Sequence, residues 1–249
     1  MGSVPRAPPS ISASVSSRAL ALAAWYRAPS RPASISGTAA KLLARSVRAG
    51  ARVVYLLLTS GDKGLRDPGP SPSQVAELRE SEQRDAARVL GVGEVHFLRQ
   101  PDGELENTRD LREALVRYLR LLRPVTVFTH DPVWPDQPYV GHRDHRIAGR
   151  AVLDAVYPAA RNGRFFPEHR QAGLAPHAVP EVWLFGSAAP NAWVDVATTF
   201  EAKIASRLAH ASQTRDPASL RTGWRTLAAW TGAPVGLPLA EAFLVLPLG

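Results

Sequence analysis

Cysteine is absent from this chain of 249 residues. Disulfides, thiolate metal sites and cysteine nucleophiles are therefore excluded, and histidine and the carboxylates remain as the strong metal ligands. A reducing compartment is compatible with this composition, so we expect a cytoplasmic protein. Long hydrophobic runs are also absent. Because no stretch of about 18 apolar residues occurs, the sequence predicts no membrane span.

Negative charge is missing from the first part of the chain. Residues 1–61 contain eight Lys and Arg but no Asp or Glu, whereas residues 62–249 contain 22 of each sign. The net charge of +8 therefore belongs to the N-terminal stretch, and the rest of the chain gives no support for a nucleic-acid groove. Residues 1–36 are rich in Ser, Ala, Pro and Arg, which predicts a disordered arm. A short apolar run at residues 19–25 is compatible with a strand or a helical turn.

Strand and helix patterns alternate from Gly37 onward. The expected strands are residues 52–59, 95–98, 125–130, 181–186, 193–196 and 242–246. The expected helices are residues 39–45, 71–90, 108–122, 142–156, 198–211 and 217–230. This alternation is typical of βαβ units with right-handed crossovers. The sequence therefore predicts one α/β domain over residues 37–249, with a mostly parallel sheet.

The segment Gly141-His142-Arg143-Asp144-His145 opens one of these helices. At a spacing of three, the two imidazoles project from one face of the first helical turn. Imidazole is the commonest zinc-type ligand, and a nearby carboxylate usually orients it through its second ring nitrogen. This segment therefore predicts half of a metal or acid/base site. The alternative is an exposed helix start that carries two solvated histidines.

Other polar residues follow the predicted strands. Asp62 lies in the loop after the first buried strand, and His130 and Asp131 close the third. Because ligands bind outside the carboxyl ends of parallel strands, we expect these residues to share an edge with the two histidines. Glu82 falls on the apolar stripe of its helix, three residues after Arg79. A buried carboxylate must be paired or near a ligand, so a structural Arg79/Glu82 pair and a ligand contact both stay open.

Taken in order, these residues resemble the PIG-L or LmbE-like family of metal-dependent N-acetylglucosamine deacetylases. The Gly141-His142-Arg143-Asp144-His145 segment carries the resemblance most directly. The other matching segments are residues 59–64, 79–84, 90–92, 101–103, 123–124, 129–132, 156–162, 181–183 and 210–214. The resemblance runs from Gly37 to the end of the chain.

The resemblance implies a Rossmann-like three-layer α/β sandwich and a small-molecule amino-sugar substrate. It also implies a zinc ion, or another divalent metal, that activates water against the acetamide carbonyl. By the same analogy, His145 is a metal ligand, and His142 supports the oxyanion or protonates the leaving amine. Asp144 would orient a histidine. The residues that we expect to contact the substrate are Arg79, Asp62 and Asp131.

One departure from the family pattern concerns the first strand. In the family this strand ends in Ala-His-Pro-Asp-Asp, which supplies two metal ligands and the catalytic base, and here residues 25–35 contain neither His nor Asp. A catalytic zinc ordinarily needs three protein ligands, so we expect weak zinc binding and impaired deacetylation. We interpret residues 1–36 as a disordered arm or as the product of a shifted reading frame. Codons for residues 27–32, displaced by one nucleotide, can read Ala-His-Pro-x-Asp-Pro.

Three functional hypotheses follow. The first is a zinc-dependent deacetylase of an N-acetylated amino sugar or its conjugate, impaired in this chain. The second is a noncatalytic carbohydrate-binding or regulatory pseudoenzyme. The third is a nucleic-acid binder that uses the basic arm, which the balanced charge of residues 62–249 disfavours.

Overall fold

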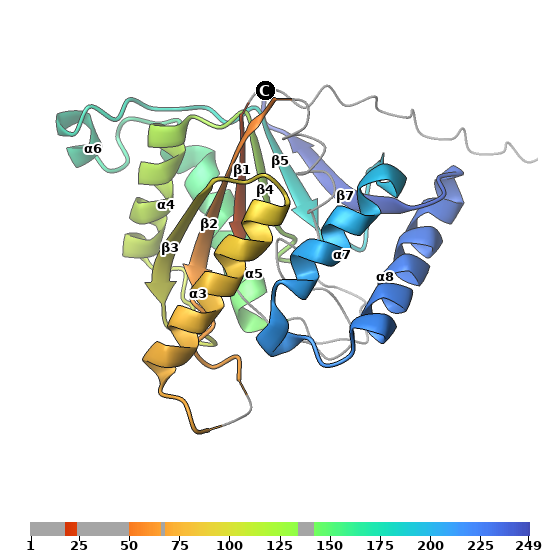
Figure 1. The fold of residues 1–249 in the computed structure, drawn as a ribbon. Helices are drawn as coiled ribbons and strands as arrows, with labels where there is room; N and C mark the ends of the chain where they lie inside the picture. Colours follow the sequence, from red (N-terminus) through yellow and green to blue (C-terminus); the bar gives the residue numbers. More distant parts are fainter. Residues whose placement is uncertain (1–17, 24–49, 66–67, 134–141) are drawn as a thin grey trace, which may run out of the picture.

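A seven-stranded sheet forms the centre of the protein, whose computed structural model describes residues 18–23, 50–65, 68–133 and 142–249 (Figure 1). Its strands are β1 Arg18–Ala23, β2 Arg52–Thr59, β3 Glu94–Gln100, β4 Thr126–His130, β5 Glu181–Phe185, β6 Ala192–Asp195 and β7 Ala240–Pro247, in the spatial order β3-β2-β1-β4-β5-β7-β6. The ladders from β3 to β5 are parallel, whereas β7 runs antiparallel to both β5 and β6. The expected α/β class is therefore confirmed, and the sheet is mixed. The Rossmann-like three-layer description stays a prediction.

The helices begin where local sequence signals place them. They are α3 Pro72–Val89, α4 Arg109–Leu122, α5 Arg143–Asp154, α6 Glu168–Gln171, α7 Phe200–Leu208 and α8 Pro217–Gly232. Ser71 caps α3 in a capping box with Gln74, and the hydroxyl of Thr108 accepts from the N–H of Leu111 to cap α4. Shorter turns are η1 Ala155–Ala160, η2 Ala197–Thr199, η3 Ala211–Gln213 and η4 Ala233–Val235. None of the helices within the described residues has the length and apolar character to cross a membrane.

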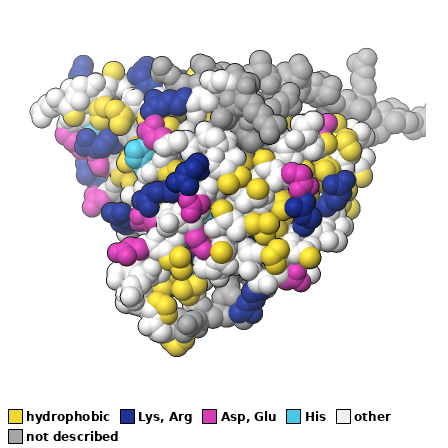
Figure 2. Space-filling view, viewed as in Figure 1, with side chains coloured by type: hydrophobic (Ala, Val, Ile, Leu, Met, Phe, Trp, Pro, Cys, Tyr) yellow, Lys and Arg dark blue, Asp and Glu magenta, His cyan; other side chains and the backbone are white. Residues whose placement is uncertain are grey.

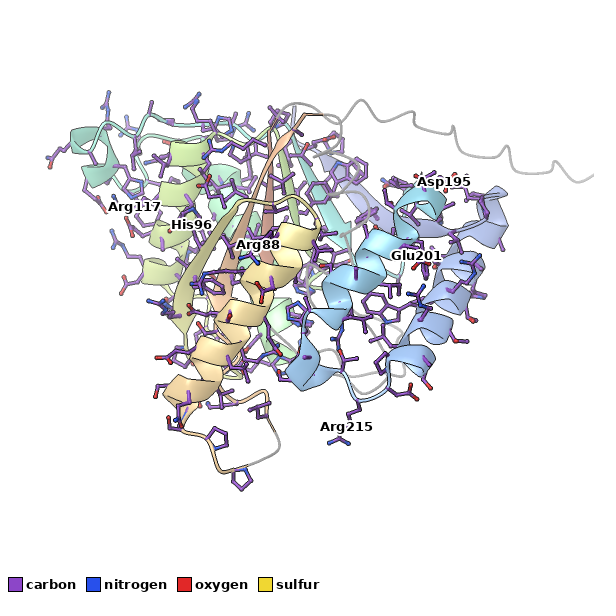
Figure 3. The ribbon with its side chains drawn as sticks, in the orientation of Figure 1. Arg88, His96, Arg117, Asp195, Glu201 and Arg215 are labelled. Carbon is purple, nitrogen blue, oxygen red and sulfur yellow. The ribbon has the colours of Figure 1, made fainter. Side chains whose placement is uncertain are left out.

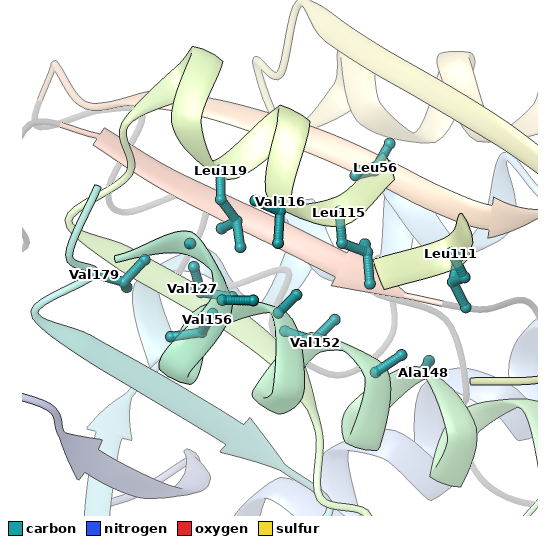
Figure 4. Packing of buried hydrophobic residues seen from close by; sticks show 14 of the residues in the cluster. Leu56, Leu111, Leu115, Val116, Leu119, Val127, Ala148, Val152, Val156 and Val179 are labelled. Atoms are coloured by element: carbon teal, nitrogen blue, oxygen red, sulfur yellow. The ribbon is translucent and has the colours of Figure 1, made fainter. Parts of the chain in front are cut away.

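Hydrophobic clusters cover both faces of the sheet. Tyr55 and Leu57 of β2 belong to the cluster under α3, α7 and α8, while Leu56 and Leu58 belong to the cluster under α4 and α5 (Figures 1 and 4). A strand buried on both faces reads as a continuous apolar run, which explains why residues 52–59 were predictable.

The outer sides of the helices carry charges of both signs. Arg88, Arg117 and Glu201 lie on the solvent side of α3, α4 and α7 (Figure 3). On the face shown in Figure 2, basic and acidic side chains of the described residues are interspersed. The helices are therefore amphipathic, with the apolar side against the sheet.

The strand β1 lies in the middle of the sheet, between β2 and β4. Arg18 pairs with Arg52 on one side, and Ala19 pairs with Thr126 on the other. The prediction of a disordered arm over residues 1–36 is therefore wrong for Arg18–Ala23, which form a strand of the central sheet. The backbone of this apolar run forms hydrogen bonds with two neighbouring strands. These hydrogen bonds stabilise a strand although the surrounding sequence is rich in Ser and Pro. The rest of the arm and the helix expected at 39–45 lie outside the described residues.

The strand order reverses at β1. The chain continues from β1 to β2 and β3 on one side, and then returns to place β4 on the other side of β1. In an open α/β sheet, the crevice at the carboxyl ends of such a strand pair is where ligands bind. The end of β4, at His130, lies at this switch point.

Candidate functional site

Three histidines gather at the carboxyl end of β4. The ring of His145 stacks on that of His130, with centroids 3.9 Å apart and planes inclined by 15°. The ring of His142 lies 5.6 Å from that of His145. The helix α5 approaches this closely because Gly149 has no side chain: a Cβ there would lie 2.3 Å from the carbonyl oxygen of His130. The predicted grouping of His142 and His145 with residues 130–131 is present in the structure.

Burial disfavours the charged form of His142 and His145. The pKa of His145, which is 4% exposed, is lowered well below its usual value by burial and then by the neighbouring His130 and His142. Burial also lowers the pKa of His142, against the opposing charge of Asp144. The Nδ1 of His142 accepts from the N–H of Asp144 at 3.2 Å and so caps α5. Neutral imidazole is the form that binds a metal or accepts a proton. The lowered pKa of His142 and of His145 favours this form.

The carboxylate of Asp144 is fully buried and faces the loop after β3. It accepts from the backbone N–H of Gly103 at 2.6 Å and from that of Leu105 at 3.1 Å. We expected this carboxylate to orient a histidine, but its hydrogen bonds are to backbone. The side chain reaches the loop because it projects from the first turn of α5, on the side where the loop passes. Its position therefore fixes a loop, and the orienting role toward a histidine stays a prediction.

The two other predicted carboxylates also lie at this edge. Asp131 is buried directly after β4, and its side chain accepts from the N–H of Val133 at 2.8 Å. Asp62 is partly exposed in the loop after β2. Asp131 therefore shapes the turn that leaves β4, while Asp62 is accessible from solvent.

The carboxyl of Asp102, after β3, was not among the predicted site residues. It accepts from the hydroxyl of Thr59 and from the N–H of Lys63, each at 3.3 Å. Burial and then the charge of Asp144 raise the pKa of Asp102 to about 6. The sequence signal for it was its place in a Pro-Asp-Gly turn at the carboxyl end of a strand.

The guanidinium of Arg79 is buried behind the site. It donates to the carboxylate of Glu82 at 3.0 Å and to the hydroxyl of Ser212 at 3.2 Å. The carboxylate of Glu82 also accepts from the N–H of Ser212 at 2.6 Å. Burial lowers the pKa of Arg79 to about 10, so the side chain stays charged at neutral pH. The Arg79/Glu82 pair is therefore confirmed, and it holds η3 against α3.

A second buried carboxylate of α3, that of Glu80, was also missed. It accepts from the hydroxyl of Ser60 at 2.7 Å, from Arg99 at 2.8 and 3.1 Å, and from Arg84 at 3.0 Å. The hydrogen bonds from Arg99 are the largest cause that lowers the pKa of Glu80, to about 2. Only the pairing with Arg84, four residues later, was visible in the sequence.

The side chains that the structure describes do not by themselves form a zinc site of the family type. Within the described residues, no group of three His, Cys, Asp or Glu side chains is placed to hold a metal ion. The sequence of residues 24–49, which follows β1, contains no His, Cys, Asp or Glu. Among the described residues and residues 24–49, the ligand set of a catalytic zinc with three protein ligands is therefore incomplete.

Comparison with known proteins places these observations in a family. The family model described as PIG-L: GlcNAc-PI de-N-acetylase matches residues 35–156. The diacetylchitobiose deacetylase of Thermococcus kodakarensis is 36% identical over 217 residues, which cover 86% of this chain and 78% of that protein. The 1D-myo-inositol 2-acetamido-2-deoxy-alpha-D-glucopyranoside deacetylase of Kineococcus radiotolerans is 29% identical over 178 residues, which cover 59% of this chain and 47% of that protein.

The fold agrees with a solved structure of the same kind. The N,N'-diacetylchitobiose deacetylase from Pyrococcus horikoshii, complexed with its inhibitor MPG, superposes with a TM-score of 0.82 and 27% sequence identity. The match covers 93% of this chain and 84% of that one. Sequence similarity over most of both chains, the common fold and the grouped histidines together show that this chain belongs to the PIG-L family of deacetylases.

Proposed function

We propose that this chain binds an N-acetylated amino sugar, N-acetylglucosamine or a conjugate of it, at the carboxyl edge of β1 and β4. The observation that carries the proposal is the group of three histidines, with His130 and His145 buried and stacked, at the switch point of the sheet. Two relatives that are named as deacetylases of acetamido sugars support the substrate class.

The proposed site residues have different roles: one exchanges a proton with the substrate, and the others bind the sugar. His142, half-buried with Nδ1 used as a helix cap, has Nε2 to exchange a proton with an acetamide oxygen or a leaving amine. Asp62 and Asp131 are the proposed acceptors for sugar hydroxyls. Arg79 is also a proposed contact of the sugar, and its guanidinium is held in place by Glu82 and Ser212. The reaction of the family is hydrolysis of the acetamide bond.

We further propose that deacetylation is impaired in this chain and that zinc, or another divalent metal, binds weakly. The reason is the lack of ligands and of a carboxylate base in residues 24–49. The same observation favours the second candidate function, a noncatalytic carbohydrate-binding protein that keeps the pocket.

One experiment separates these functions. N,N'-diacetylchitobiose is titrated into the protein by calorimetry, and acetate release is followed with and without added zinc. We expect saturable binding, little acetate release, and about tenfold weaker binding in His142→Ala, because a polar partner of the ligand is lost. His96→Ala on β3 is the matched control and leaves binding unchanged. Absence of binding contradicts the proposal. Stoichiometric zinc with full turnover contradicts the impairment.

We do not propose nucleic-acid binding for this protein. Charges of both signs are interspersed on the face in Figure 2, which gives no argument for an electrostatic groove there. The cytoplasmic location stays a prediction.

A further inference from the structure

Three chain segments meet at the candidate site. They are the loop after β2 at residues 60–64, the loop after β3 at residues 101–106, and the start of α5 at residues 142–145. Exposed ion pairs join the same segments: Lys63 with Glu104, and Glu106 with Arg143 at 3.6 Å. Exposed pairs contribute little, so the buried links between these segments decide how firmly they are held.

The first buried link is the carboxyl of Asp102. It lies in the loop after β3 and accepts from Thr59 and from the N–H of Lys63, each at 3.3 Å. Asp102 is 7% exposed. The side chain therefore ties the loop after β3 to the end of β2 and the loop that follows it.

The second buried link is the carboxylate of Asp144, which has no exposed surface. One oxygen accepts from the N–H of Gly103 at 2.6 Å, and the other accepts from the N–H of Leu105 at 3.1 Å. Both oxygens are therefore engaged by one loop. Hydrogen bonds from backbone N–H groups to an ionised carboxylate are about twice as strong as neutral ones.

We propose that Asp102 and Asp144 are positioning residues that lock the loop at residues 101–106 between the loop after β2 and the helix that carries His142 and His145. Asp144 then acts on ligand binding through the backbone N–H groups of this loop, in addition to its charge near His142. The effect on ligand binding rests on the proposed function, because the ligand is the proposed amino sugar. The contacts that hold the loop do not depend on any ligand.

The charge and the shape of the carboxylate are both needed. Asparagine matches aspartate in size but presents one oxygen and one NH₂ group. In Asp144→Asn, either Gly103 or Leu105 therefore loses its acceptor and faces a second donor. The lost acceptor releases that part of the loop while the packing of α5 on the sheet is retained.

Amide hydrogen exchange measured residue by residue tests the lock. In Asp144→Asn, we expect exchange at Gly103 or Leu105, or at both, to accelerate about tenfold or more, as the loss of a buried hydrogen bond requires. The buried positions of α4, such as Leu115 and Leu119, keep their rates. Asp195→Asn is the control, because that carboxylate also accepts from a backbone N–H, that of Ala197, but lies in the segment between β6 and α7 (Figure 3). We expect it to change exchange only locally.

A second measurement reads the site. Binding of N,N'-diacetylchitobiose weakens about tenfold in Asp144→Asn while the thermal midpoint measured with ligand absent shifts little, which a purely structural role would not produce. Unchanged exchange at both amides overturns the lock, and so does an equal acceleration throughout the chain. If Asp144→Asn does not fold, Asp102→Asn gives the same test at the amide of Lys63. If the unsubstituted protein binds no sugar, the proposed function fails, and the exchange rates still decide the lock.

Discussion

At the scale of single residues, two buried carboxyl groups show how their neighbours set the pKa. Glu80 is surrounded by donors, two of them arginines, and its pKa falls to about 2. Asp102 lies near the like charges of Asp144 and Asp62, and burial with these charges raises its pKa to about 6. Ionisation of Glu80 therefore stabilises the fold, whereas ionisation of Asp102 opposes it. This difference follows from hydrogen-bond partners far away in the sequence.

Replacing Glu80 with glutamine measures the first effect. Because the folded pKa lies below the unfolded value, the contribution of Glu80 is present above about pH 4.5 and is lost as the pH falls toward 2. We expect Glu80→Gln to lower the free energy of unfolding by about 2 kcal/mol at pH 7 and by much less at pH 3. Urea denaturation at the two pH values checks this. Glu77→Gln, at an exposed position of the same helix, is the control and leaves stability nearly unchanged. An equal loss at both pH values contradicts the account.

The sequence predicted residues whose signal is local and missed those whose role depends on distant partners. His142 and His145 were recognised as neighbours because they lie three residues apart at the start of a helix. Glu80 and Asp102 were missed because the groups that define them, Arg99 and Thr59, lie in other elements. The hydrogen-bond partners of Asp144 were missed for the same reason, since they belong to a loop about 40 residues earlier in the sequence.

At the scale of elements, the packing of α5 against β4 sets the histidine group. The first residues of α3 and α4 were predictable because Ser71 and Thr108 cap these helices through contacts within one helical turn. The approach of α5 to β4 was not, because it depends on the missing side chain of Gly149 beside the carbonyl of His130. The stacking of His130 on His145 follows from this approach.

Adding one methyl group tests that approach. In Gly149→Ala, the Cβ would lie 2.3 Å from a backbone oxygen, so α5 must move away from β4. We expect a loss of about 3 kcal/mol in the free energy of unfolding. Gly223→Ala in α8 is the matched control, since nothing lies within 4 Å of its Cβ. There the better helix propensity of alanine stabilises the protein by up to about 1 kcal/mol. Equal effects in urea denaturation at the two positions contradict the role of Gly149.

At the scale of the whole molecule, β1 joins the two halves of the sheet. The strands β2 and β3 lie on one side of it, and β4, β5, β7 and β6 lie on the other. The sequence predicted the alternation of elements but not this central place, because the partners of β1, at Arg52 and Thr126, are distant in the sequence. Without β1, β2 and β4 would each present an unpaired edge.

Shortening the chain tests this role. A protein that begins at Gly37 lacks β1, so we expect it to aggregate and to lose cooperative unfolding. A protein that begins at Arg18 keeps every described strand and should unfold as the full chain does. Size-exclusion chromatography with thermal unfolding followed by circular dichroism distinguishes the two. A monomeric, cooperatively folded 37–249 fragment would show that β1 is dispensable.

The place of β1 also constrains how the protein is made on the ribosome. Ala19 is synthesised long before its partner Thr126. At translation rates of about 5 to 20 residues per second, the nascent strand waits on the order of 5 to 20 s for that neighbour. During this interval one margin of the growing sheet is available to foreign strands, so newly made chains depend on rapid elongation or on a chaperone that shields that margin.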